Sequence, residues 1–323
     1  MDIKSFFKKD YEKGLWSMES ITLIYMLFTT ILIGYYWNGL ADPMSMLITR
    51  LIMLVAMAAV YGLYRLYPCR ALRILRVFPP LLGLIFWYPE TYDFCSQLPY
   101  LDHLFAGIDQ TLFGCQPALV FNTVVTSTFW SEAFNMGYYA YYYMMGATLI
   151  FYLLCRYPDA DRAGFVFLSS FFLFYLIYEF LPVAGPQYYF KAVGTEAAET
   201  GVFPAVGYYF QTHTEMLMPE IKGIFSQLVL GAQEVGERPT AAFPSSHVGM
   251  STVTMLLAWQ AKNKWLFWLM MPLYLLLCCA TVYIQAHYLI DSICGFITAV
   301  LFFVLTNWMY QRLHPNRTAN SKS

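Results

Sequence analysis

Two short motifs near the C-terminal end of the chain place histidine beside residues that can bind an anion or orient an imidazole ring. One is Phe-Pro-Ser-Ser-His at 243–247 and the other is His-Tyr-Leu-Ile-Asp at 287–291; each stands at the start of a long apolar run. Histidine exchanges protons near neutral pH and can also act as a nucleophile. Together the motifs indicate histidine-based chemistry on a phosphate ester at a membrane surface.

The first motif predicts the start of a helix that binds an anion. Pro244 suits a first turn, where its missing N–H would be unpaired in any case. Ser245 and Ser246 add hydroxyl groups beside the exposed N–H groups of that turn, and a helix N-terminus attracts phosphate. His247 would project from the same turn and could protonate a leaving oxygen as a general acid.

The second motif predicts an oriented nucleophile. His287 and Asp291 are four residues apart, so they share one face of a helix. The carboxylate would fix the tautomer of the imidazole, which could then attack phosphorus and form a phospho-histidine. Either motif alone is typical of a helix cap or a stabilising pair. The two together, on either side of a returning apolar run, favour catalysis.

The composition predicts an integral membrane protein. Of the 323 residues, 59% are hydrophobic and 12% are charged, whereas soluble domains carry about 25% charged residues. A soluble core of this length could not bury so much apolar surface. The net charge of −1 provides no basic field and therefore gives no indication of a nucleic-acid partner.

The apolar runs predict an all-α membrane protein with about eight transmembrane helices. A spanning helix needs roughly 20 mostly apolar residues. The candidate spans are 18–38, 45–66, 72–88, 132–155, 164–182, 246–261, 265–284 and 288–311.

The distribution of charge predicts the orientation. With the N-terminus inside, all but four of the 19 Lys and Arg residues fall on the inner side; the exceptions are Arg50, Lys191, Lys222 and Arg238. This asymmetry is that of the positive-inside rule, and it places both termini in the cytoplasm. Both histidine motifs then reach the outer face.

The same count divides the chain into three parts. Residues 1–88 form N-terminal transmembrane helices, 89–312 form a phosphatase-like or phosphotransferase-like membrane domain, and 313–323 form a cytoplasmic tail. Two long segments of the second part, 89–131 and 183–243, face outward. Cys95 and Cys115 share the first of them, so a disulfide between these residues is left open.

The two motifs resemble those of the type 2 phosphatidic acid phosphatase superfamily. Its members show Pro-Ser-Gly-His and a later Ser-Arg-x5-His-x3-Asp. The resemblance implies that His247 is the acid, His287 the nucleophile and Asp291 its orienting group, in a helical core with the site at one membrane face.

A larger part of the chain, about 90–310, is similar to the branch that contains the fungal inositol phosphorylceramide synthase, the aureobasidin-resistance protein. The similarity includes Asp-x-x-Leu-Phe-Gly at 109–114, an aromatic segment at 130–143 with Glu132, and a Pro- and Tyr-rich turn at 182–189. This branch implies transfer of a lipid headgroup phosphate.

The chain departs from the superfamily pattern at the phosphate clamp. Thr281 stands where many members have an arginine, and a phosphoryl group in transfer needs cationic partners. Arg238 is the first candidate for that role and Lys191 the second. For Arg238 the alternative is a loop charge paired with Glu234 or Glu237, and for Lys191 it is a solvated surface charge.

The sequence thus favours a lipid phosphate phosphatase at the outer membrane face, with a membrane-lipid phosphate as substrate. A headgroup phosphotransferase and a non-catalytic lipid-binding protein are the alternatives. The mechanism calls for no metal and no other cofactor, since histidines and a cation do the chemistry. A bacterial inner membrane, with the site toward the periplasm, is the expected location; the sequence predicts no oligomeric state.

Overall fold

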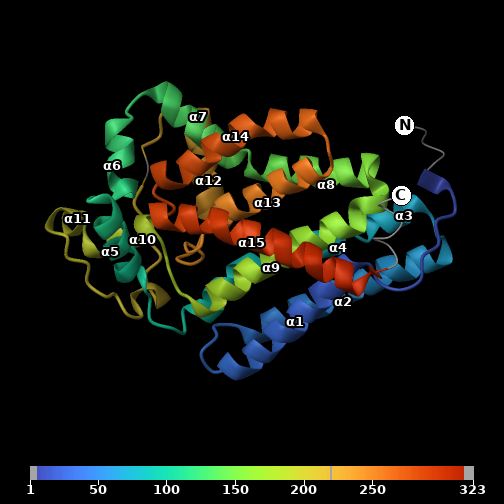
Figure 1. Ribbon diagram of the computed structural model, residues 1–323. Coiled ribbons are helices and arrows are strands. Elements are labelled where there is room, and N and C mark those ends of the chain that lie inside the picture. Colours follow the sequence, from blue (N-terminus) through green and yellow to red (C-terminus); the bar gives the residue numbers. More distant parts are fainter. Residues whose placement is uncertain (1–5, 219, 316–323) are drawn as a thin grey trace.

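The computed structural model describes residues 6–218 and 220–315, and this part of the chain is helical with no strand (Figure 1). The helices are α1 (Ser17–Tyr36), α2 (Pro43–Leu66), α3 (Arg70–Leu75), α4 (Phe78–Cys95), α5 (Asp102–Phe113), α6 (Pro117–Val124), α7 (Thr128–Tyr139), α8 (Tyr141–Cys155), α9 (Ala160–Phe180), α10 (Pro186–Val193), α11 (Glu196–Thr200), α12 (Ile224–Gly236), α13 (Ser246–Gln260), α14 (Lys264–Tyr283) and α15 (Leu289–Leu313).

Within the described residues, six helical segments are long and apolar enough to cross a membrane, as in an integral membrane protein. They are Ser17–Tyr36, Pro43–Leu66, Arg70–Cys95, Tyr157–Phe180, Lys264–Tyr283 and Leu289–Leu313. The all-helical prediction is confirmed, whereas the count of eight spans is not.

The two expected spans that fall short are those at 132–155 and 246–261. The first is divided at Ala140 into α7 and α8, so its apolar run is not one straight helix. The second is α13, which has 15 residues and therefore extends only about 22 Å at 1.5 Å per residue. An apolar stretch of sequence does not show where one helix ends and the next begins, nor that a helix within it is too short to cross the membrane.

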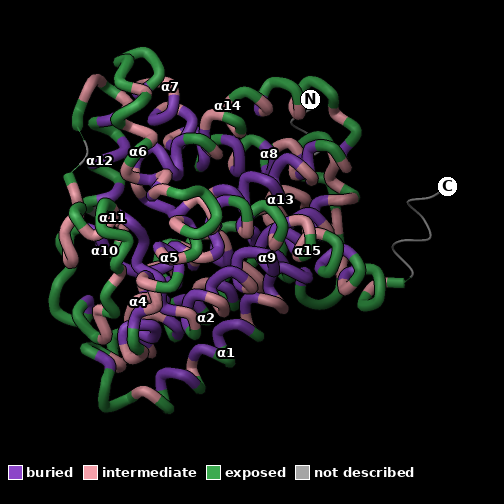
Figure 2. The backbone as a smooth tube through the Cα atoms, turned by 60° about the vertical axis from the view of Figure 1, so that its left-hand side comes forward, coloured by how far each residue is buried: buried purple, intermediate pink, exposed green. Residues whose placement is uncertain are grey.

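α9 lies at the centre of the bundle, and α2 lies at its edge. In the segment Tyr157–Phe180, which contains α9, 78% of the most apolar stretch of 18 residues is buried inside the protein. In α2 the corresponding share is 22%. α13 packs against α8, α9, α14 and α15. Most residues of α9 and α13 are buried (Figure 2). The short helix that carries the first histidine motif is therefore enclosed by protein on several sides.

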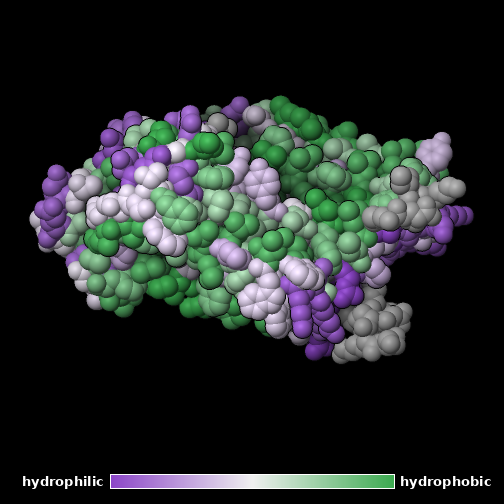
Figure 3. Space-filling model, turned by 90° about the horizontal axis from the view of Figure 1, so that it is seen from above, coloured by the Kyte–Doolittle hydropathy of each residue, from purple (hydrophilic) through white to green (hydrophobic). Residues whose placement is uncertain are grey.

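The two ends of the described chain meet at one end of the bundle, while α5, α6, α10 and α11 lie at the other (Figure 1). Ser17 at the start of α1 is hydrogen-bonded to His314 just after α15. Apolar surface covers much of the middle of the molecule, and hydrophilic residues gather toward its ends (Figure 3). Most of the expected tail at 313–323 lies outside the described residues.

The expected outer segment at 89–131 is largely helical, whereas the one at 183–243 consists of short helices joined by long connections. α4 continues to Cys95 and therefore crosses the expected boundary at residue 88 and enters the 89–131 segment, whose remainder holds α5, α6 and the start of α7. Cys95 and Cys115 are both free thiols, and Cys95 is buried against Thr240. The 183–243 segment contains α10, α11 and α12. Short helices and their connections thus build this end of the molecule.

Candidate active site

The two histidine motifs come together toward the end of the bundle that holds α5, α6, α10 and α11. His247 lies in the first turn of α13, and His287 lies in the connection between α14 and α15. Their ring centroids are 5.7 Å apart, with an angle of 63° between the rings. Both rings line one small cavity, so they can act on the same bound group.

Close packing between the starts of α13 and α15 fixes this arrangement. The N–H of Ser245 donates to the backbone carbonyl of Asp291 at 3.0 Å. Gly295 faces the carbonyl of Ser245 so closely that an added Cβ would collide with it. Ser245 also caps α13, because its Oγ accepts the N–H of Val248 at 3.3 Å.

The His287 ring is held by a backbone carbonyl. Its Nδ1 lies 2.8 Å from the carbonyl oxygen of Ala242, and its backbone N–H donates to Thr281 O at 3.0 Å. A carbonyl only accepts, so Nδ1 carries the proton and Nε2 keeps its lone pair in the neutral ring. Burial lowers the pKa of His287 to about 4, while the hydrogen bond to Ala242 opposes the shift. The ring is therefore neutral, and nucleophilic at Nε2, at pH 7.

Asp291 is close to His287 but does not hydrogen-bond to it. Its Oδ2 lies 3.8 Å from Nδ1 of His287 and accepts the N–H of Tyr288 at 2.8 Å. The carboxylate therefore caps the start of α15 and lies beside the imidazole. The orienting hydrogen bond that the sequence predicted from Asp291 is supplied in the structure by the carbonyl of Ala242.

The His247 ring lies between two tyrosines. Its centroid is 4.5 Å from that of Tyr138, with the rings nearly parallel, and 4.7 Å from that of Tyr141. Among the described residues, no hydrogen bond to a ring nitrogen of His247 is found. The tyrosines fix the plane of the ring and leave its nitrogens available to a bound group.

Two cavities meet at His247. The small one, of about 20 Å³, is polar and reaches Arg238, Gln187 and His287. The larger one, of about 350 Å³, lies between α4, α7, α8, α9 and α12 and is mostly apolar. The residues that line both are Tyr88, Tyr138, Glu237, Ser246 and His247. An apolar chain in the larger cavity would thus place its polar end at the histidines.

Comparison with known proteins gives one match. The model of the PAP2 superfamily matches residues 104–305, a range that includes both histidine motifs. The chain belongs to the PAP2 superfamily. Members of this superfamily are phosphatases or phosphotransferases. No curated protein and no solved structure matches the chain.

Arg238 is a cation that borders the candidate site of this PAP2 protein. Its side chain lines the small cavity together with both histidines, and its Nη1 donates to the backbone carbonyl of Glu237 at 2.9 Å. Among the described residues it forms no ion pair with Glu234 or Glu237. Thr281, at the position of the usual arginine, is buried and shares a 2.9 Å hydrogen bond with Ser292.

The other expected phosphate ligands divide into two groups. Ser246 lines both cavities, as a ligand to the bound group would. Ser245 is fully buried as the cap of α13 and lines neither cavity. Lys191 is exposed near the end of α10 and also lines neither. The structure therefore brings Ser246 and Arg238 to the histidines, but not Lys191.

Glu237 is a site residue that the sequence interpretation did not identify. Its carboxylate accepts hydrogen bonds from Tyr138 Oη at 3.0 Å, Gln187 Nε2 at 2.7 Å and Gln233 Nε2 at 3.4 Å. Burial raises the pKa of Glu237, and these hydrogen bonds oppose the shift. A Glu next to an Arg in an apparent loop is typical of a solvated pair, so the sequence carried no signal that this side chain turns inward.

Proposed function

We propose that the protein is an integral-membrane lipid phosphate phosphatase that acts through a phospho-histidine on His287. The observation that carries the proposal is the hydrogen bond from Nδ1 of His287 to Ala242, which leaves Nε2 free in a cavity shared with His247. A free, neutral and fixed imidazole nitrogen is what attack on phosphorus needs.

In the first step, the lone pair on Nε2 of His287 forms a bond to phosphorus. The bond from phosphorus to the leaving alkoxide breaks, and protonated His247 gives its proton to that oxygen as the alcohol leaves. Burial and the neighbouring His287 lower the pKa of His247, and an anionic phosphate between the rings opposes that shift and favours the protonated form. Arg238 compensates charge on the phosphoryl oxygens as they pass through the transition state.

In the second step, water attacks the phosphorus of the phospho-histidine. His247, now neutral, accepts a proton from the water. The P–N bond then breaks, and the electron pair of that bond returns to Nε2 of His287. Phosphate leaves, and both side chains are restored to their starting states. Asp291 favours the positive charge that His287 carries while the phosphoryl group is attached, because the carboxylate lies 3.8 Å from Nδ1.

The larger cavity supports a lipid as the substrate. It is lined by apolar side chains of α4 such as Leu81, Leu84 and Ile85, and it reaches His247. A hydrocarbon chain can occupy it while the phosphate meets the histidines. We place this site at the outer face, with both termini in the cytoplasm; a bacterial inner membrane with the site toward the periplasm is the setting that we propose.

A lipid headgroup phosphotransferase is the second candidate, and a separate polar cavity favours it. That cavity, of about 800 Å³, is lined largely by hydroxyl and amide side chains of α6, α7 and α12. Gln233 borders it and also donates to Glu237 at the site. An alcohol supplied from this cavity would replace water in the second step, in keeping with the resemblance to inositol phosphorylceramide synthases.

Purified protein supplied with a panel of lipid phosphates tests the two candidates. We expect release of inorganic phosphate without any added alcohol. Headgroup exchange with little phosphate release would favour the phosphotransferase. Binding of lipid without release or exchange, and without any effect of His287→Ala, would favour a non-catalytic protein instead.

A further inference from the structure

α5 carries two buried carboxylates on the face that is turned toward the catalytic segments. Asp102 and Asp109 are both fully buried, and they are seven residues apart, two turns of the helix. The opposite face exposes Leu104, Ile108 and Leu112. The pattern is unlike that of an ordinary surface helix, whose charged side chains face water.

Asp109 holds the start of α15. Its Oδ2 accepts the N–H of Leu289 at 2.9 Å, and its Oδ1 accepts the N–H of Ile290 at 3.0 Å. These are the first two amides of the helix, which have no partner within it. Since His287 is only two residues before Leu289, this bidentate contact limits the movement of the catalytic connection.

Asp102 holds the turn that faces His287 from the other side. It accepts the N–H groups of Ala184 and Gly185 at 2.9 and 2.8 Å, and the hydroxyl of Tyr288 at 3.2 Å. Gly185 has a φ of 98°. A Cβ there would lie 2.6 Å from the carbonyl oxygen of Ala286, so the turn packs directly on the catalytic connection.

The turn is linked to the imidazole itself. Val183 O accepts the N–H of Ala242 at 3.0 Å, and Ala242 O is the partner of Nδ1 of His287. One route thus leads from Asp102 through the turn and Ala242 to the ring, and a second leads from Asp109 to the backbone that follows the ring. Both routes start from α5 and end at the nucleophile.

We propose that Asp102 and Asp109 are positioning residues, and that α5 serves as a brace that holds His287 in its attacking geometry. The brace deepens the proposed function and rests on it. Two fully buried carboxylates are a costly way to stabilise a helix start, and α15 already has the cap that Asp291 supplies. What the two contacts add is a fixed position for Nε2 of His287.

The variant Asp109→Asn tests the brace. It keeps the volume of the side chain but turns an N–H₂ group toward one of the two backbone donors. We expect kcat to fall about 10- to 100-fold, the usual cost of small misplacements of reacting groups, while KM for the lipid phosphate stays near the wild-type value, because the small cavity keeps Arg238 and Ser246.

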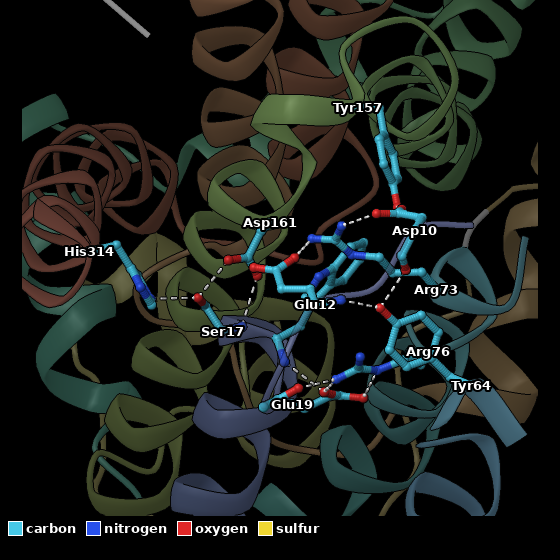
Figure 4. A network of polar contacts seen from close by, with 12 residues as sticks. Asp10, Glu12, Ser17, Glu19, Tyr64, Arg73, Arg76, Tyr157, Asp161 and His314 are labelled. Carbon is cyan, nitrogen blue, oxygen red and sulfur yellow. Dashed lines mark hydrogen bonds and ion pairs between the residues drawn. The ribbon is translucent and has the colours of Figure 1, made fainter. Parts of the chain in front are cut away.

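Asp161→Asn is the matched control. Asp161 is also a buried carboxylate that accepts the first amide of a helix, Ser17 N at 2.8 Å (Figure 4). It lies near the start of α9, at the end of the bundle where the two ends of the described chain meet and away from α5 (Figure 1). Its loss should reduce stability and leave kcat per folded molecule unchanged. Wild-type kcat in folded Asp109→Asn, or an equal loss in both variants, would overturn the brace.

Hydrogen exchange separates this proposal from the proposed function. In the wild type and both variants, we measure exchange in the peptide that covers 284–292. Faster exchange of this peptide in Asp109→Asn and not in Asp161→Asn supports the brace, whether or not the protein turns over a lipid phosphate. Absence of turnover would contradict only the proposed phosphatase activity. Equal exchange in all three proteins overturns the brace whatever the activity.

Discussion

The nucleophilic role that we propose for His287 depends on one backbone carbonyl. Ala242 accepts the hydrogen of Nδ1 and so decides which nitrogen of the ring is free. The type and spacing of residues 243–247 and 287–291 were sufficient to predict two histidines at one site. The partner of Nδ1 was not predictable, because a carbonyl belongs to every residue. The residue before Ala242, Ala241, has a left-handed backbone, with a φ of 64°.

Arg238 and Lys191 give a matched test at the scale of single residues. Both residues are exposed, but Arg238 borders the small cavity with the two histidines, whereas Lys191 borders neither cavity at the candidate site. Arg238→Gln should lower kcat/KM about 100-fold, as loss of a donor to a transition-state oxyanion does. Lys191→Gln should leave kcat/KM unchanged. Steady-state kinetics on a lipid phosphate gives both values, and a larger loss in Lys191→Gln would reassign the clamp.

At the scale of elements, the sequence predicted the starts of the two helices that carry the motifs, but it did not predict the break between α7 and α8. The starts of α13 and α15 coincide with the two motifs, because proline, serine and aspartate mark helix starts. The break at Ala140 was not predicted, since tyrosines and other apolar residues continue through it. That break places Tyr138 and Tyr141 on different helices, both against the ring of His247.

The packing of α7 on α14 gives a prediction for this scale. A Cβ on Gly137 would lie 2.7 Å from the backbone nitrogen of Leu277, so the two helices are in backbone contact there. Gly137→Ala should destabilise the protein by about 1–3 kcal/mol, the range for overpacking. Gly146, on α8, has no atom within 4 Å of such a Cβ. Gly146→Ala should therefore be neutral or stabilising by up to about 1 kcal/mol.

Thermal unfolding in detergent measures both glycine variants under the same conditions. The account requires a lower midpoint for Gly137→Ala than for Gly146→Ala. The reverse order would show that α7 and α14 are not packed as closely as described.

At the scale of the whole molecule, a network of charged and polar groups ties the N-terminal segment to the bundle (Figure 4). The network lies at the end of the bundle where the two ends of the described chain meet (Figure 1). Arg76 makes a bidentate ion pair with Glu19, through Nε at 2.8 Å and Nη2 at 2.5 Å. Arg73 binds Asp10 and Glu12. Composition and the positive-inside rule predicted basic residues at this end, but not their partners, which are far apart in sequence.

The pair of Arg76 and Glu19 is almost fully buried, so it provides a test of this network. Arg76→Met leaves the carboxylate without its partner and should cost about 3–5 kcal/mol. Adding Glu19→Gln removes the unpaired charge, so the double variant should be more stable than Arg76→Met alone. Chemical denaturation of the three proteins measures this difference. A double variant that is less stable than the single one would contradict a pairwise role.

Trapping of the covalent intermediate tests the central claim most directly. The His247→Ala variant is mixed with an aryl phosphate, whose leaving group needs no acid, and is then denatured in alkali, in which phospho-histidine persists. Mass spectrometry should find one phosphoryl group on His287, because the variant lacks the base that assists hydrolysis. The same treatment of a His247→Ala/His287→Ala protein should give none. A phosphoryl group on another residue, or label that persists without His287, would contradict the account.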